Sequence, residues 1–456
     1  MYVADHYAAF IAATAKVPAS AQRMAVLAVL DLAAAALAGY STSGAAAARR
    51  AAEQIWGMGD APVWFSRHRL PPVGAAFANS AAASMLDLDD GHRAAAGHPG
   101  AAIIPAVMAA AHGGETDAPH ILTAIALGYE IATRASAARD LSCVDTLVSG
   151  RWVGHGVAAA VAWMRGLTEP QIAQAIAIAG TSAPSLGPVA YSRIMGNHLK
   201  EGIPWATATG LAAVDLAAAG FTAPIDLFDN AALFDQQTLT TGLSKDWMIE
   251  QIYFKPYSCC RWAHAAIQAT LALLADHSLS ARAIDHIRIE TFSRALQLNN
   301  EPRPRTLEAA QYSVPFCVAL AVLEGEESLL PMTESALSNS DVMELAERIS
   351  IELAPDLDRM FPGSVPARVE VNAESRVYGS TVLMPKGEPS NPMTQSELEA
   401  KFHTLADPVL GVARAEWLLA AIQALGDQGS SPLLQQLGKP IELADGRLIA
   451  ANGAGQ

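Results

Sequence analysis

Aromatic and charged residues are scarce in this sequence. Only 6% of its 456 residues are aromatic and 16% are charged, whereas 51% are hydrophobic, many of them alanine, leucine or valine. The high hydrophobic content argues against a disordered chain, and the small side chains favour closely packed helices. A chain of this length can bury a large core and form two domains.

Cysteine is also scarce, and no long uninterrupted apolar run stands out. The four cysteines are Cys143, Cys259, Cys260 and Cys317. Their spacing matches neither a disulfide framework nor a zinc motif, which favours reduced thiols in the cytoplasm. The best candidate for a membrane span, residues 24–39, contains Asp31 and is predicted to be a buried helix, because no apolar run is expected to be long enough to cross a bilayer. No basic leader precedes an apolar stretch at the N-terminus, so neither a signal peptide nor a membrane partner is expected.

Positive charge is the third shortage. The 30 lysines and arginines are outnumbered by 45 aspartates and glutamates, which gives a formal net charge of −15. A field of this sign repels nucleic acids and argues against a nucleic-acid partner. A small anionic substrate would need a local group of cationic side chains that works against the overall field.

Helical periodicity dominates the first 265 residues and returns near the end of the chain. Apolar residues recur at three- and four-residue spacing, which predicts helices over residues 7–40, 75–88, 102–112, 119–138, 153–165, 169–180 and 203–220. Thr394 and Glu397 have the spacing of a capping box at the start of a further helix. Two more helices are predicted over residues 407–426 and 430–437.

The intervening region contains the alternation typical of β-strands. Residues 284–292 predict one strand, and residues 367–385 predict two strands joined by a short turn. Helices are predicted between them, over residues 309–324 and 340–354.

These patterns predict a mainly α fold with two domains. A large all-helical domain is formed by both ends of the chain, residues 1–270 and 395–456, and a smaller α+β domain covers residues 271–394. The cleft between two such domains is a common place for a small ligand.

The segment MLDLDDGHRAAAGHPG, residues 85–100, concentrates acidic and histidine side chains in a turn-rich stretch. Its candidate residues are Asp87, Asp89, Asp90, His92 and His98. Three interpretations are open: a metal site, a loop ordered by aspartate caps, and an active-site wall with His98 facing the substrate. A calcium loop of this kind would end in glutamate where His98 stands, so no metal is expected. In the third interpretation the aspartates order the loop and support a cationic pocket.

The segment YFKPYSCCRWAH, residues 253–264, places Lys255 among aromatic and apolar neighbours. Burial would lower the pKa of its ammonium group and suit Lys255 to act as a base. The alternative is an ordinary surface lysine before a proline turn. Cys259 and Cys260 are expected to be buried small residues rather than nucleophiles. Arg261 could bind a carboxylate through its planar guanidinium group.

Six segments together resemble the MmgE/PrpD family. They lie in family order between residues 75 and 402, and they read AAFANSAAASMLDLDDGH…HPG, ALGYEIATRA, LKEGIPWATATGLAAVDLAAAGFTAP, FKPYSCCRWAHAAI, AQYSVPFCVALAVLEG and PKGEPSNPMTQSELEAKF. The family includes 2-methylcitrate dehydratase, cis-aconitate decarboxylase and iminodisuccinate epimerase. The resemblance implies a large helical domain with a smaller α+β domain, a homodimer, and chemistry on small carboxylates without a cofactor.

Residues in or near these segments supply the candidate site. Those expected to be catalytic are Lys255, His98 and Tyr312, the last as a hydrogen-bond donor from the smaller domain. Those expected to bind the substrate are Arg261, His155, Lys200, Asn197, His198 and Asp90. For each histidine the competing interpretation is a structural role, which is the commoner one for a lone histidine on a helix.

The chain departs from the family pattern at several positions. Gly91 stands where many members have threonine. Val153 stands at the expected histidine position, with His155 two residues later. Asn197 stands where lysine is usual, and Lys200 stands where histidine is usual. The residue set of a typical dehydratase or decarboxylase of the family is therefore incomplete.

This incomplete set favours the least demanding chemistry in the family. An epimerase needs only a base on one face of a carbon beside a carboxylate and an acid on the other. The lead hypothesis is a cofactor-independent epimerase of an aspartate-like dicarboxylate such as iminodisuccinate, with Lys255 and His98 transferring protons. The alternatives are a 2-methylcitrate-type dehydratase or related carboxylate lyase, and a non-catalytic member that binds carboxylates.

Overall fold

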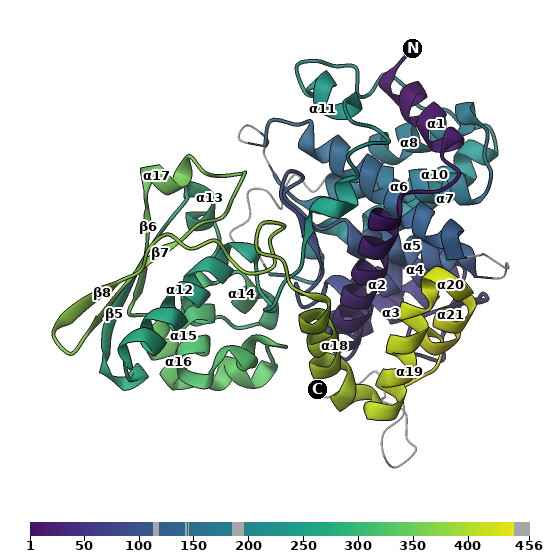
Figure 1. Ribbon diagram of the computed structural model, residues 1–456. Coiled ribbons are helices and arrows are strands. Elements are labelled where there is room, and N and C mark those ends of the chain that lie inside the picture. Colours follow the sequence, from purple (N-terminus) through teal and green to yellow (C-terminus); the bar gives the residue numbers. More distant parts are fainter. Residues whose placement is uncertain (113–117, 142–143, 145, 185–195, 442–456) are drawn as a thin grey trace.

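Both ends of the chain build a large helical part, and the middle of the chain builds a smaller part beside it (Figure 1). The computed structural model describes residues 1–112, 118–141, 144, 146–184 and 196–441. The predictions for Cys143 and for residues 442–456 lie outside this range. The helices of the larger part are α1 (Val3–Ala13), α2 (Ala19–Gly39), α3 (Ser43–Trp56), α4 (Pro72–Ser84), α5 (Gly100–Ala111), α6 (Ala118–Ala137), α7 (Val153–Met164), α8 (Glu169–Thr181), α10 (Ile203–Ala218), α11 (Gln236–Thr240), α18 (Gln395–Leu410), α19 (Val412–Gln423), α20 (Leu425–Gln428) and α21 (Ser431–Leu437).

The segment predicted as one helix over residues 7–40 forms two helices. Pro18, which has no backbone N–H, lies at the N-cap of α2 and separates it from α1. By length and composition alone α2 could cross a membrane, so the prediction that no apolar run is long enough was wrong. In this fold α2 packs against α18, and Asp31 accepts a hydrogen bond of 2.6 Å from Lys401 Nζ. This buried ion pair joins the N-terminal and C-terminal helices.

In the part of the chain that the structure describes, four very short strands lie between the helices of the larger part. Strands β1 (Ala61–Pro62) and β2 (Arg69–Leu70) pair antiparallel. Strands β3 (Gly91–His92) and β4 (Ile252–Tyr253) pair in the same way. The second pair ties the acidic loop to the segment that contains Lys255, although the two are far apart in the sequence.

The smaller part is a four-stranded sheet with helices packed on it. Its strands are β5 (Ile284–Thr291), β6 (Ile349–Leu353), β7 (Arg368–Ala373) and β8 (Arg376–Gly379), and its helices are α12 (Arg261–His277), α13 (Ser293–Leu296), α14 (Leu307–Gln311), α15 (Val314–Glu324), α16 (Ser340–Ala346) and α17 (Pro355–Asp358). The strand order is β6-β5-β7-β8, with β5 and β6 parallel and the other pairs antiparallel. Val369, Val371 and Ala373 alternate along β7 as its buried residues, and α12 packs on this strand.

Two predicted helices of the smaller part differ from the structure. The helix predicted over residues 309–324 is divided at Ser313, whose hydroxyl caps α15 by accepting a hydrogen bond from Phe316 N. The helix predicted over residues 340–354 is helical only in its first half. Its second half is strand β6, because it pairs with β5 along the whole length of β6.

Other elements agree with the sequence-based predictions. The strand over residues 284–292, the two strands within 367–385 and the capping box of Thr394 with Glu397 are confirmed. The mainly α composition is also confirmed.

The buried apolar side chains form two main clusters. The larger one draws on residues 3–254 and 398–441, and the smaller one on residues 257–373. Helix α12 belongs to the smaller cluster, which therefore begins before residue 271. The predicted domain boundaries at 271 and 394 stay a prediction.

Candidate active site

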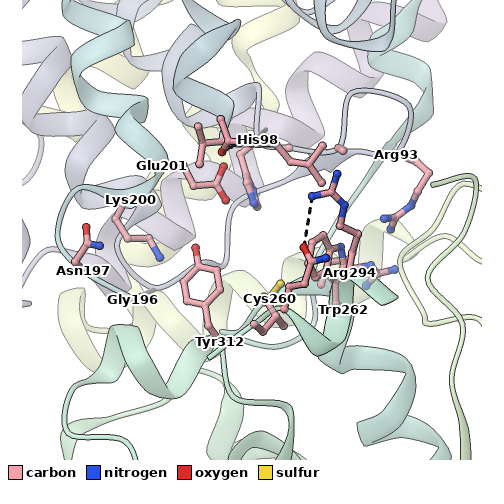
Figure 2. Close-up of a pocket in the computed structure, with 18 of the residues that line it drawn as sticks. Arg93, His98, Gly196, Asn197, Lys200, Glu201, Cys260, Trp262, Arg294 and Tyr312 are labelled. Carbon is pink, nitrogen blue, oxygen red and sulfur yellow. Dashed lines mark hydrogen bonds between the residues drawn. The ribbon is translucent and has the colours of Figure 1, made fainter. Parts of the chain in front are cut away.

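A cavity of about 190 Å³ is lined by side chains from both parts of the chain. Its polar wall, part of which is seen in Figure 2, consists of Arg93, His98, Asn197, Lys200, Glu201, Arg261, Arg294 and Tyr312. The cavity is smaller than pockets for drug-sized ligands, which measure about 300–1,000 Å³. Its size and its excess of cationic groups suit a small anion.

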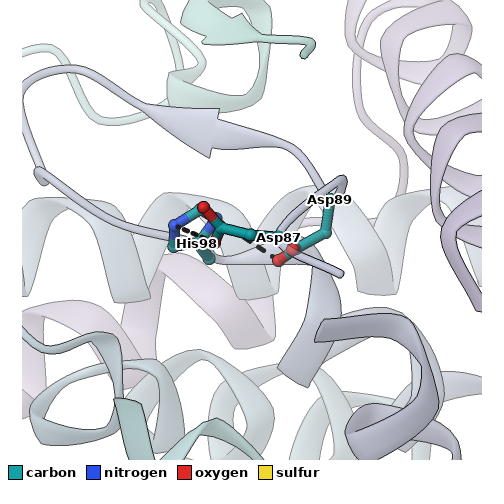
Figure 3. A group of neighbouring side chains, drawn as sticks. All are labelled: Asp87, Asp89 and His98. Carbon is teal, nitrogen blue, oxygen red and sulfur yellow. Dashed lines mark ion pairs between the residues drawn. The ribbon is translucent and has the colours of Figure 1, made fainter. Parts of the chain in front are cut away.

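His98 lies at the edge of this cavity, and its ring points into it (Figure 2). The backbone N–H of His98 donates to Ser149 Oγ at 2.9 Å. Ring atom Nδ1 lies 2.9 Å from the backbone oxygen of Asp90 and 3.3 Å from a carboxylate oxygen of Asp89. Ring atom Nε2 lies 3.7 Å from the Asp87 carboxylate (Figure 3), which is beyond hydrogen-bond distance. Nε2 is therefore the ring nitrogen that can meet a ligand.

Opposing influences set the protonation of His98. Burial and the Lys255 ammonium group lower the pKa of the imidazole, but carboxylates led by Asp89 outweigh them and raise it to about 9. His98 is therefore an imidazolium at neutral pH. In this state it donates protons and cannot accept one.

Lys255 lies behind the acidic loop. Its side chain is fully buried, and Nζ donates to the backbone oxygen of Asp87 at 2.8 Å and lies 3.3 Å from the Asp87 carboxylate. Burial alone would lower the pKa of this ammonium group, but Asp87 and Asp89 together with neighbouring groups outweigh burial and raise it. The predicted lowering of the pKa was therefore wrong. Among the described residues that line the cavity Lys255 does not appear, and its catalytic role stays a prediction.

Among the described residues, Asp87, Asp89 and His98 form a group whose positions could suit a metal ion. One possible ligand atom from each lies within 4.8 Å of the others (Figure 3). The Lys255 ammonium group already provides a positive charge beside Asp87, and His98 carries a second beside Asp89. The negative charges of the cluster are thus matched without an ion. The expectation of no metal stays a prediction.

Asp90 supports the site from the core. Its carboxylate accepts hydrogen bonds from Tyr129 Oη at 2.6 Å and from the backbone N–H of Gly100 at 3.0 Å. Burial raises the pKa of Asp90 to about 7. Both carboxylate oxygens face these partners, and the described residues that line the cavity do not include Asp90. The predicted substrate contact of Asp90 is untested and stays a prediction.

Arg261 and Arg93 enter the cavity wall as a pair linked by Glu388. Arg261 donates to Glu388 Oε1 at 2.9 and 3.0 Å, and Arg93 forms an ion pair with the same oxygen. The remaining N–H groups of Arg261 contact the backbone oxygens of Lys386 and Pro385 and ring atom Nδ1 of His264. All five N–H donors of this guanidinium are thus used. The prediction that Arg261 grips a substrate carboxylate with its fork is therefore not supported by this geometry.

Tyr253 lies between these two arginines. The guanidinium carbons of Arg93 and Arg261 lie 4.8 and 4.9 Å from the centre of its ring, which is within range for cation–π contacts. The ring also fills the space beside Gly91, where a Cβ atom would lie 2.3 Å from Tyr253. Glycine is the residue that fits at position 91 while Tyr253 keeps this place.

Lys200 and Glu201 are presented by an unusual turn. Lys200, Glu201 and Gly202 follow one another with φ angles of +43°, +58° and +72°. Left-handed backbone costs a non-glycine residue about 1–2 kcal/mol, so the turn persists only because its surroundings hold it. Lys200 Nζ donates to Gln311 Oε1 at 2.8 Å and lies 5.4 Å from the centre of the Tyr312 ring.

Tyr312 and Cys260 complete the cavity with neutral acidic groups. Burial raises the pKa of the Tyr312 phenol and of the Cys260 thiol above their ordinary values. At neutral pH the phenol is a hydrogen-bond donor and the thiol is not a nucleophilic thiolate. The expectation that Cys260 is not a nucleophile agrees with this environment.

Both halves of the chain match models of known protein families. Residues 6–245 match the MmgE/PrpD N-terminal domain, and residues 257–427 match the MmgE/PrpD C-terminal domain. The chain belongs to the MmgE/PrpD family. The resemblance found in the sequence is confirmed.

Three relatives within this family have related names. The cis-aconitate decarboxylase of Aspergillus terreus is 27% identical over 416 residues, covering 82% of this chain and 83% of that protein. The cis-aconitate decarboxylase of Homo sapiens is 26% identical over 424 residues, covering 86% and 83%. The cis-aconitate decarboxylase-like protein oryM of Aspergillus oryzae is 25% identical over 447 residues, covering 90% and 91%.

The positions that depart from the family pattern fall in different places. Asn197 and Lys200 both line the cavity. Val153 is buried, and His155 lies in the helical core, where Nδ1 contacts the backbone oxygen of Ile176 at 3.1 Å. Burial lowers the pKa of His155 to about 4, so it is neutral. This position does not support the predicted role of His155 in binding substrate, which stays a prediction.

His198 points away from the cavity. Its ring lies at the surface, 3.4 Å from Glu308 and 3.4 Å from the hydroxyl of Ser43. The cavity wall formed by the described residues includes its neighbours Asn197 and Lys200 but not His198. Of these three candidates, Asn197 and Lys200 therefore line the cavity and His198 does not.

Three charged residues of the cavity were missed by the sequence-based reasoning. Arg93, Glu201 and Arg294 line it without belonging to a recognisable catalytic pattern. Arg93 stands directly after His92 in the acidic loop, and Glu201 stands directly after Lys200, so both were adjacent to candidates. Arg294 comes from α13 of the smaller part, and no local signal distinguishes it from other surface arginines.

Proposed function

We propose that the protein is a carboxy-lyase that removes carbon dioxide from a small di- or tricarboxylate and protonates the product from His98. The observation that carries this proposal is the His98 ring, which points into a cavity whose wall is rich in cationic side chains. The pKa of His98 is raised to about 9, and burial raises the pKa of Tyr312 and Cys260. A decarboxylation needs an acid for the carbon that loses carbon dioxide, and these groups are in their acid forms.

The charges around the cavity fit a substrate with several carboxylates. Arg93, Lys200 and Arg294 join His98 as cationic groups on its wall. A carbanion forms when carbon dioxide leaves, and fixed positive charge in a site of low dielectric stabilises it. This local excess of positive charge satisfies the requirement that the net charge of −15 imposes on any anionic substrate.

The reaction balances with the residues at hand. The carbon–carbon bond to the departing carboxylate breaks, and its electron pair stays on the substrate carbon beside a conjugated double bond or carboxylate. His98 Nε2–H supplies the proton that forms the new carbon–hydrogen bond. The neutral imidazole then regains a proton from solvent, so the cycle consumes one proton and releases one carbon dioxide. Lys255 keeps Asp87 in place behind His98 and acts as a positioning residue.

An epimerase would require a base to act first. The pKa values of His98, Tyr312 and Cys260 in the cavity are raised, which favours their acid forms, and Lys255 is a buried ammonium group. Burial lowers the pKa of Arg261, but its guanidinium donates to Glu388 and does not act as a base. The relatives named cis-aconitate decarboxylase also support a lyase over the epimerase that the sequence first suggested. The carboxylate lyase that was the alternative hypothesis is now the proposed function.

The test is proton NMR in D₂O with the purified protein and three separate candidates: cis-aconitate, 2-methylcitrate and an iminodisuccinate stereoisomer. Loss of carbon dioxide from cis-aconitate, with one deuterium in the product, would support the proposal. Loss of water from 2-methylcitrate would make the protein a dehydratase, and interconversion of iminodisuccinate stereoisomers would make it an epimerase. Binding of cis-aconitate without turnover would favour the non-catalytic hypothesis.

Two histidine variants test whether turnover depends on His98. His98→Asn is expected to abolish turnover, because asparagine cannot supply the proton. His198→Asn changes a histidine of the neighbouring turn that points to the surface, and it is expected to keep turnover within about twofold of the unmodified protein. Equal activity of the two variants would remove His98 from the mechanism.

A further inference from the structure

Glu201 is an acidic side chain on a cavity wall that is otherwise rich in cations. Figure 2 places its carboxylate between Lys200 and His98. Among the described residues that line the cavity it is the one carboxylate. A negative charge here opposes the binding of an anionic substrate, so its presence requires a reason.

The contacts of Glu201 lead to His98 through one residue. Carboxylate oxygen Oε2 of Glu201 accepts hydrogen bonds from Ser149 Oγ at 2.7 Å and from the backbone N–H of Ser149 at 2.9 Å. Ser149 Oγ in turn accepts the hydrogen bond from the backbone N–H of His98 at 2.9 Å. The hydroxyl of Ser149 has one proton, which it gives to Glu201, and its lone pairs receive the His98 N–H. The three residues therefore form a directed chain of hydrogen bonds.

Close packing fixes this chain in one geometry. A Cβ atom at Gly97 would lie 2.3 Å from Ser149 Oγ, and one at Gly150 would lie 2.5 Å from the backbone oxygen of Glu201. Glycine at both positions allows the three loops to approach this closely. The left-handed conformation of Lys200 and Glu201 is a second sign that the surroundings define the turn.

We propose that Glu201 is a positioning residue for His98, acting through Ser149, and that its negative charge also acts on the His98 ring. The inference deepens the proposed function, because it concerns the group that would deliver the proton. The charged groups that face His98 are Asp87, Asp89, Lys255 and Glu201. Of these, Glu201 is the one on the strained turn that also presents Lys200, so a single turn places a substrate-facing ammonium group and holds the proton donor.

Two variants separate the charge of Glu201 from its hydrogen bonds. Glu201→Gln keeps an oxygen that can accept both hydrogen bonds from Ser149 but removes the negative charge. Ser149→Ala removes the hydroxyl that links Glu201 to the His98 backbone but leaves the charge. Glu53→Gln is the control, since Glu53 pairs with His68 at 3.1 Å on the protein surface and so changes an unrelated carboxylate–histidine pair.

The first measurement needs no substrate. The imidazole of His98 is titrated by NMR in histidine-labelled protein, with its signal assigned by its loss in His98→Asn. In Glu201→Gln it is expected to titrate at a pH lower by about half a unit or more, because a nearby negative charge no longer favours the imidazolium. An unchanged titration in Glu201→Gln would overturn the electrostatic part of the proposal, even if the protein proved not to be a carboxy-lyase.

The second measurement is the kinetics of any substrate turned over by the protein. In Ser149→Ala, kcat is expected to fall by about 10-fold to 100-fold with KM changed by less than about threefold, because a small displacement of a catalytic group has effects of this size. Wild-type kcat in Ser149→Ala would overturn the positioning part. If Glu201→Gln does not fold, Ser149→Ala tests the proposal through its kcat and its His98 titration. Loss of the hydroxyl should reduce kcat. The charge of Glu201 should still keep the His98 titration near that of the wild type.

Discussion

The buried ion pair between Lys255 and Asp87 offers the most direct test of how the site is held together. Lys255 is fully buried and Asp87 is 4% exposed. Lys255→Met keeps the length of the side chain but removes the charge, which leaves the Asp87 carboxylate buried without its ammonium partner. Removing one member of a buried ion pair costs about 3–5 kcal/mol of stability.

A double-mutant cycle measures the coupling energy between Lys255 and Asp87. Asp87→Asn should also be strongly destabilising, because it removes the negative charge that neutralises the buried ammonium group of Lys255. In the double variant neither buried charge remains. Its loss of stability is therefore expected to be smaller than the sum of the two single losses by about 2–3 kcal/mol, near the upper end of measured couplings.

Urea unfolding followed by circular dichroism measures the cycle. Since the chain has two hydrophobic cores and need not unfold in one step, the midpoints of the variants are compared under identical conditions. The control pair is Arg303 and Glu347, which lie 2.5 Å apart with side chains 50% and 47% exposed. Arg303→Met and Glu347→Gln should each cost less than about 1 kcal/mol. Additive losses for Lys255 and Asp87, or losses no larger than those of the control pair, would refute the reasoning.

Three further predictions concern the site and its surroundings. In the wild type, activity is expected to fall as pH rises through the His98 pKa of about 9, and in Asp89→Asn this fall should move to lower pH by at least about one unit, because burial and Lys255 then dominate. A pH profile that stays in place would contradict this prediction. Lys200→Met should raise KM by about tenfold or more with a smaller effect on kcat, as expected for loss of a charge-assisted contact to a carboxylate. A change in kcat alone, measured by steady-state kinetics, would disprove this prediction. Because His155 lies in the core, His155→Gln should lower the free energy of unfolding in a urea titration by about 1–3 kcal/mol and leave kcat per folded molecule at the wild-type value. A large loss of kcat would indicate that His155 belongs to the site.

The sequence predicted those parts of the fold that depend on local periodicity. Helices such as α7 and α8 carry apolar residues at helical spacing within a single segment, so their positions follow from the segment itself. Strand β6 was missed because its five residues are too short to distinguish a strand from the end of a helix. What makes it a strand is its parallel pairing with β5, a contact between segments far apart in the sequence.

The site features that were predicted depend on the local sequence, and those that were missed depend on contacts between distant segments. His98 and Lys200 were found because they lie in unusual local clusters or in segments that resemble the family. The raised pKa of Lys255 was not predictable, because its cause is Asp87, a residue 168 positions away that the β3–β4 pairing brings close. The contacts of Arg261 were not predictable for a similar reason: Glu388 and two backbone oxygens of a distant loop occupy its donors.

The contact between Gly91 and Tyr253 restricts how this chain could change in evolution. The family resemblance puts threonine at position 91 in many members, yet here a side chain at that position would meet the Tyr253 ring. The ring has little freedom to turn aside, because Arg93 and Arg261 lie near it. A lineage that gained threonine at 91 would therefore first need a smaller residue at 253, and a lineage that gained tyrosine at 253 would first need glycine at 91. The order of these two substitutions matters, so the two positions are expected to behave as one inherited unit.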